Sequence, residues 1–85
     1  MAKIDEATLR EMVQAGAVQS VRVIGKADRW YVVASVAGRD RHLGSARKEY
    51  REWRHLDTLA QWVRDLGLSR FEVDCLDYRP EQRSL

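Results

Sequence analysis

The stretch that decides the fold is "SVRVIGKADRWYVVASV", residues 20–36. It is rich in β-branched and aromatic residues, and its first part alternates: Val21 and Val23 point one way while Arg22 points the other. Residues 25–28, "GKAD", are typical of a turn, because glycine and aspartate tolerate turn conformations. The sequence therefore predicts a β-hairpin at the centre of the fold, with a second strand from Trp30 to the end of the stretch.

The chain after this hairpin predicts further strands. A turn at Gly38 and Arg39 leads into a third strand over residues 39–45. The next ten residues, "ARKEYREWRH" at 46–55, carry six formal charges and two aromatic rings. We interpret them as a charged turn over residues 47–49 and a short strand over 50–54 that forms a hairpin with the preceding strand. An N-terminal extension of the following helix is the alternative.

A helix is predicted before the central hairpin, in "IDEATLREMVQAGAV". Asp5 is a suitable N-cap, because its carboxylate can accept a hydrogen bond from a free amide of the first turn. Leu9, Met12 and Val13 follow helical spacing. Gly16 ends the helix, since glycine adopts the left-handed conformation that follows many helices.

A second helix is predicted in "HLDTLAQWVRDLG". Asp57 is the predicted cap, Leu56 is placed before it as a staple, and Gly67 ends the helix. The apolar face consists of Leu59, Ala60, Val63 and Leu66.

The last predicted strand has Phe71, Val73 and Cys75 on its inward face, and residues 77–85 form a frayed tail. The element order is therefore α-β-β-β-(β)-α-β, which indicates an α+β fold with a mainly antiparallel sheet and two helices packed on one face. We expect one domain over residues 1–76.

Composition indicates a globular protein. The chain has 85 residues, of which 45% are hydrophobic and 33% charged, and its net charge is only +2. The N-terminus lacks the apolar core of a signal peptide and no apolar run is long enough for a membrane span, so we expect a cytoplasmic protein with no membrane partner. A single cysteine excludes an internal disulfide.

The motifs of common catalytic and cofactor sites are absent. His42 and His55 have no second ligand at metal-site spacing, and Cys75 is isolated. The sequence contains neither a phosphate-binding loop nor a dinucleotide fingerprint. We therefore expect no enzymatic activity, no catalytic residues, no cofactor and no metal.

A basic and aromatic surface is the remaining candidate site. Arginine and lysine can contact phosphates, and aromatic rings can stack on bases or anchor a protein partner. The alternative is a solvated sheet face with no binding role, in which Glu49 and Glu52 neutralise the arginines. Which of the two aromatic rings faces solvent stays open. The candidate nucleic-acid or partner-binding residues are Arg39, Arg41, Arg47, Lys48, Tyr50, Arg51, Trp53 and Arg54.

One family resemblance covers most of the chain. Residues 50–74, "YREWRHLDTLAQWVRDLGLSRFEVD", contain an arginine-aromatic pair at Arg51 and Trp53, a leucine-aspartate cap, a helix ending in Leu-Gly and a strand of the form "RFEVD". This pattern resembles the C-terminal half of ParC-family partition-associated proteins, and residues 15–47 are similar to the N-terminal part. The resemblance implies an accessory role in DNA maintenance on a plasmid or other mobile element, with DNA or a DNA-bound partition protein as ligand. It implies no catalytic signature.

Two functions follow as hypotheses. The first is the accessory protein just described. The second is a small protein-binding inhibitor or adaptor, such as an anti-defence factor that blocks a host protein complex through a mixed charged and aromatic surface. A double-stranded RNA-binding module is a weaker option, because the second helix lacks a lysine cluster. A homodimer is possible under each hypothesis.

Overall fold

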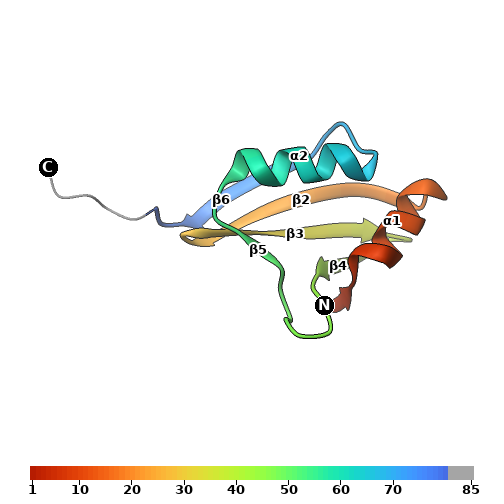
Figure 1. Cartoon of the computed structure of the whole chain (residues 1–85), viewed down its shortest axis with the longest axis horizontal. Helices are drawn as coiled ribbons and strands as arrows, with labels where there is room; N and C mark the ends of the chain where they lie inside the picture. Colours follow the sequence, from red (N-terminus) through yellow and green to blue (C-terminus); the bar gives the residue numbers. More distant parts are fainter. Residues whose placement is uncertain (81–85) are drawn as a thin grey trace, which may run out of the picture.

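The computed structural model describes residues 1–80 and shows an α+β fold. In this part of the chain a mixed sheet of six strands is accompanied by two helices (Figure 1). The elements are β1 (Ala2–Ile4), α1 (Glu6–Gln14), β2 (Val18–Ala27), β3 (Arg29–Val36), β4 (Arg39–Leu43), β5 (Glu52–Trp53), α2 (Leu56–Leu66) and β6 (Glu72–Tyr78).

The sheet has the strand order β1-β4-β3-β2-β6, and β5 also pairs with β3. The central strands β2, β3 and β4 form the predicted antiparallel meander. The two edge strands differ from a purely antiparallel arrangement, because β1 runs parallel to β4 and β6 runs parallel to β2. The three-residue strand β1 was not predicted; it pairs Ile4 with Leu43 and buries Ile4.

The charged stretch after β4, residues 46–55, contains the short strand β5. This confirms the prediction of a strand there and excludes the alternative, an extension of the following helix. Its predicted partner was wrong, because β5 pairs with β3, placing Trp53 opposite Trp30. One edge of β4 pairs with β3 and the other with β1, so β4 has no edge left for β5. Both β4 and β5 therefore lie along the same side of β3, β4 beside residues 33–36 and β5 beside residues 30–31.

The turns of the meander lie close to their predicted positions. The first is tighter than predicted: β2 continues through Gly25 to Ala27, and Ala27 adopts a φ of 54°. The second turn is formed by Ala37 and Gly38, one residue earlier than predicted, with φ values of 52° and 78°. Two successive residues with positive φ are typical of a type I′ hairpin turn.

The helix boundaries confirm three predictions and correct one. Asp5 caps α1, since its Oδ1 accepts a hydrogen bond from the Thr8 amide at 2.7 Å. Gly16 and Gly67 follow the two helices with φ of 72° and 109°. Asp57 is not the cap of α2, because the helix already begins at Leu56 and Asp57 lies in its first turn. The N-cap is His55, whose side chain makes no capping hydrogen bond.

The core lies between the sheet and the two helices. Val21 and Val23 of β2, which were predicted to share one face, both point into it. The helices contribute Leu9, Leu59, Val63 and Leu66 to the same cluster. The opposite side of the sheet, with Arg22, Tyr31 and His42, is not covered by a helix, and we call it the open face.

The last strand differs most from expectation. Phe71 is half-buried, but Val73 is 45% exposed and Cys75 is exposed, so the predicted inward face of this strand was wrong. As an edge strand, β6 has a neighbour on one side only, β2. It also continues through Tyr78, whose ring stacks on Trp30 with 4.3 Å between centroids. The beginning of the predicted tail is therefore part of the sheet, and its residues 81–85 lie outside the described part.

Candidate interaction site

Two of the predicted binding residues hold the fold together. Trp53 is 7% exposed and packs against Trp62 of α2, with 5.1 Å between ring centroids. The guanidinium of Arg51 lies 4.5 Å from the centroid of the Trp53 ring and donates to Oε1 of Glu6 at 2.5 Å. These contacts join α1, α2 and the segment around β5. Trp53 and Arg51 are thus engaged within the protein.

Glu6 is the centre of this junction. Its Oε1 also accepts a hydrogen bond from Nε1 of Trp62 at 2.8 Å, and Arg10 lies 3.7 Å from its Oε2. The hydrogen bond from Trp62, followed by Arg51, lowers the pKa of Glu6, while partial burial opposes the shift. Sequence reasoning missed this cluster because its members are 45 and 56 residues apart from Glu6.

Tyr50 is the aromatic residue that faces solvent. It is 39% exposed and lies over the open face, stacked on His42 at 4.2 Å and edge-on to Tyr31 at 4.9 Å between centroids. The loop of residues 44–51 thus folds over the open face, and the Arg51 amide returns to the sheet by donating to the Leu43 carbonyl at 2.9 Å.

His42 is buried beneath this loop. It is 2% exposed, and its Nε2 lies 3.1 Å from Oε1 of Glu49. Its Nδ1 has no hydrogen-bond partner among the described residues. No group of three or more histidine, cysteine, aspartate or glutamate side chains in residues 1–80 is arranged to hold a metal ion.

Five cations lie along the β1–β4 edge of the sheet and in the loop after β4. Lys3 joins the edge to the loop, because its Nζ donates to the Ser45 carbonyl at 2.8 Å. In the described part of the chain, the four predicted residues of this group have no carboxylate within 4.0 Å, while Lys3 has only Glu49 at 3.9 Å. We call this group the basic edge; it consists of Lys3, Arg39, Arg41, Arg47 and Lys48.

A hollow of about 540 Å³ lies within the basic edge, between α1 and β4. Lys3, Arg39 and Arg41 lie on its lining, together with Asp5, the N-cap of α1, and Thr8 of its first turn. Its apolar lining comes from Ile4, Met12, Ala17, Val36 and Ala37.

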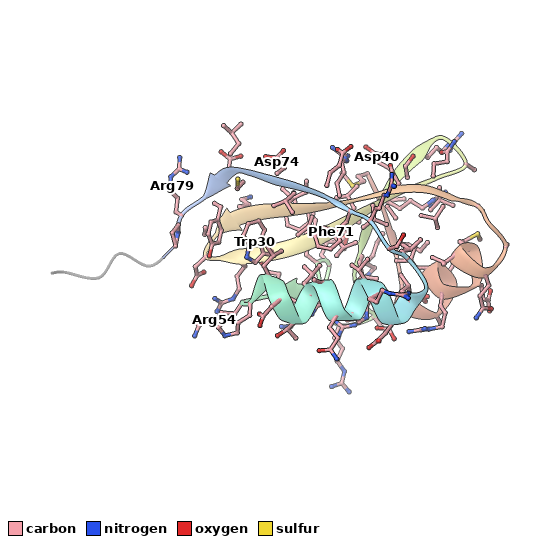
Figure 2. The ribbon with its side chains drawn as sticks, turned by 90° about the horizontal axis from the view of Figure 1, so that it is seen from above. Trp30, Asp40, Arg54, Phe71, Asp74 and Arg79 are labelled. Carbon is pink, nitrogen blue, oxygen red and sulfur yellow. The ribbon has the colours of Figure 1, made fainter. Side chains whose placement is uncertain are left out.

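The remaining predicted residue, Arg54, is separate from the basic edge. It precedes α2 and lies 3.8 Å from Asp28. Figure 2 shows Arg54 at one end of α2 and Asp40, which belongs to β4, on the other side of the molecule. The predicted set is therefore divided into four parts: the basic edge, the packed Arg51 and Trp53, Arg54 on its own, and Tyr50. Tyr50 shares its loop with Arg47 and Lys48, and its ring lies on the open face.

The opposite edge of the sheet is acidic. The edge strand β6 carries Glu72, Asp74 and Asp77, all exposed (Asp74 is labelled in Figure 2). Register pairs the first two with Arg22 and Ile24 of β2, whose side chains belong to the open face. Charge is thus separated between the two edges of one sheet, which the small net charge does not reveal.

The comparisons with known proteins give one match. The ParC-like family matches residues 4–82, nearly the whole chain. We found no matching curated protein and no matching solved structure. In residues 1–80 no helix combines the length and apolar character needed to cross a membrane. The resemblance seen in the sequence is therefore confirmed over more of the chain than its motifs covered, and the chain belongs to the ParC-like family.

Proposed function

We propose that this protein is a non-enzymatic cytoplasmic accessory factor in the partition or maintenance of a plasmid or other mobile element. It acts by binding DNA, or a DNA-bound partner, through the basic edge. Membership of the ParC-like family supports a partition-related role. The observation that carries the proposal is that the four cations on β4 and in the loop after it have no carboxylate partner in the described chain: Arg39, Arg41, Arg47 and Lys48.

The acidic residues near the basic edge leave its two arginines on β4 and its two loop cations unpaired in the described chain. Asp5 caps α1, Asp40 pairs with Arg22 at 2.8 Å, and Glu49 contacts His42 and lies 3.9 Å from Lys3. Four of the five cations can therefore contact phosphates. Each phosphate contact releases condensed counterions from DNA, so the affinity should fall steeply as salt rises.

Charge removal in the loop tests this mechanism. We expect R47A/K48A to lower the affinity for duplex DNA about tenfold at low salt and to reduce the slope of log K against log salt by about 2, because two phosphate contacts are lost. Fluorescence anisotropy with a labelled duplex at several salt concentrations measures both quantities. The variant R64A/R70A removes the same charge from exposed arginines outside the basic edge and is the matched control.

Either of two results would contradict DNA binding through the basic edge. One is the absence of binding by the wild-type chain at low salt. The other is an equal loss of affinity in R47A/K48A and in the control, which would indicate a diffuse effect of net charge.

The exposed ring of Tyr50 favours a second candidate function, a protein-binding inhibitor or adaptor. With Tyr31 beside it and charges of both signs around it, this part of the open face suits a protein interface better than a phosphate backbone. A pull-down with purified wild-type, Tyr50→Ala and R47A/K48A chains separates the two. A stoichiometric protein that is lost only with Tyr50→Ala would support the second candidate.

A further inference from the structure

Leu76 is the most exposed large hydrophobic residue of the described chain, with 79% of its surface exposed. It lies where β6 bulges: two residue steps on β2, from Ile24 to Lys26, face three on β6, from Asp74 to Asp77. The Leu76 amide donates to Oδ1 of Asp74 at 3.0 Å, which ties the two residues at the bulge together. The bulge therefore presents an apolar side chain between two carboxylates.

This edge of the sheet is not suited to the addition of another regular strand. A bulge interrupts the row of backbone groups that a further strand would pair with, and charged residues on an edge strand oppose such pairing. A partner at this edge would contact side chains instead. The surface that it meets consists of Leu76 and the flanking Asp74 and Asp77.

The hollow between α1 and β4 has the complementary character. Its apolar lining includes Ile4, Met12 and Val36. Three cations, Lys3, Arg39 and Arg41, lie on the lining and outnumber its one carboxylate, that of Asp5, which caps α1. Arg39 and Arg41 have no carboxylate within 4.0 Å in residues 1–80. An apolar side chain flanked by two carboxylates fits a hollow with an apolar floor and three cations against one carboxylate on its lining. The apolar side chain is buried while its flanking carboxylates pair with the arginines.

We propose that the occupant of this hollow is the Leu76 bulge of a second copy of this chain. The two surfaces lie on opposite edges of the sheet, β6 on one side and β1–β4 on the other. The contact is therefore heterologous, and each dimer leaves one bulge and one hollow free. Copies join head to tail, and the association goes beyond the proposed function. It shares Arg39 and Arg41 with the proposed DNA contact, whereas Arg47 and Lys48 do not line the hollow.

Sedimentation velocity of the full chain without DNA tests the proposal. We expect the weight-average mass to rise with protein concentration from about 10 μM to about 1 mM, the range of weak contacts. Raising NaCl from roughly 50 mM to roughly 500 mM should reverse the rise, because salt screens the pairing of charges. Leu76→Ser and R39E/R41E should each weaken the association at least about tenfold.

Mixing the two variants gives the sharpest result. Leu76→Ser has an intact hollow and R39E/R41E an intact bulge, so the equimolar mixture should form a 1:1 dimer that does not grow. R64E/R70E changes the same charge outside both surfaces and should associate like the wild type. Circular dichroism of Leu76→Ser should match the wild type, since the side chain is exposed.

A chain that stays monomeric over the whole concentration range would overturn the proposal. So would an association that persists in both Leu76→Ser and R39E/R41E, which would indicate a different interface. The outcome is separable from the proposed function, because R47A/K48A should still associate, and Leu76→Ser monomers should still bind DNA.

Discussion

Gly25 lacks a side chain at a place where the ring of Trp30 fills the space beside the strand. A Cβ atom at this position would lie 2.7 Å from Cζ3 of Trp30 and 2.8 Å from Cβ of Tyr78. Substitution by alanine must therefore push apart the stacked pair that joins β3 to the end of β6. We expect Gly25→Ala to lower the free energy of unfolding by about 1–3 kcal/mol, the usual cost of overpacking.

Urea unfolding measures this loss. Ser20→Ala, at an exposed position of the same strand, is the control and should change stability by less than about 0.5 kcal/mol. Equal stability of the two variants would show that the Trp30 and Tyr78 rings move aside without cost.

Glu6 predicts a pH-dependent contribution to stability. Its pKa is lower in the folded chain, chiefly because of the hydrogen bond from Trp62, so its stabilising effect is present above its ordinary value of 4.5 and is lost as the pH falls through the folded pKa. Because 43% of the side chain is exposed, solvent screening keeps the effect small. We expect Glu6→Gln to lower the free energy of unfolding by about 0.5 kcal/mol at pH 7. At acid pH, where Glu6 of the wild type is protonated, the substitution should have almost no effect.

Urea titrations of Glu6→Gln at a series of pH values check this prediction. Glu11→Gln, on the same helix and without an ion-pair partner in residues 1–80, should show no such dependence. A difference between Glu6→Gln and the wild type that stays constant from neutral to acid pH would contradict the assigned origin.

Single residues with local roles were predictable from the sequence, and residues with distant partners were not. Asp5, Gly16 and Gly67 act on neighbouring backbone, so their types and positions were sufficient. The roles of Arg51 and Trp53 depend on α1 and α2, which fold back onto them, and their charge and aromaticity suggested a surface instead.

At the scale of elements, the ring of Tyr50 is the aromatic anchor of the loop of residues 44–51. Tyr50 covers His42, and the loop ends where the Arg51 amide meets the Leu43 carbonyl. We expect Tyr50→Ala to lower the free energy of unfolding by about 1–2 kcal/mol, since it removes the stack on His42 and part of the cover over it. The Arg51 amide should then exchange its hydrogen faster.

Hydrogen exchange followed by NMR measures that change directly. Tyr50→Phe is the matched variant, because the Tyr50 hydroxyl has no hydrogen bond within the described chain and the ring is retained. It should behave like the wild type. Slow exchange of the Arg51 amide in Tyr50→Ala would show that backbone contacts alone hold the loop.

The elements themselves were largely predictable, but their neighbours in the sheet were not. Alternation and turn residues identified β2, β3 and β4, whose pairing is local along the chain. The position of β5 depends on β1, which occupies the far side of β4 and comes from the opposite end of the sequence. The exposure of β6 likewise depends on its place at the edge of the sheet.

At the scale of the whole molecule, a net charge of +2 averages over two edges of opposite sign. The basic edge carries the proposed DNA contact, and the acidic β6 with its bulge carries the proposed contact with a second copy. The sequence predicted four of the five residues of the basic edge. It could not predict the hollow, because Lys3 and Met12 reach Arg41 only through the parallel pairing of β1 with β4.

The distribution of aromatic rings between the two sides of the sheet has a spectroscopic consequence. All three tryptophans, Trp30, Trp53 and Trp62, belong to the layer between sheet and helices, whereas Tyr31 and Tyr50 lie on the open face. Intrinsic tryptophan emission therefore reports chiefly on the docking of the helices, because no tryptophan ring contacts the ring of Tyr50 in the described chain. A ligand on the open face would have to be followed through tyrosine signals or an added fluorophore.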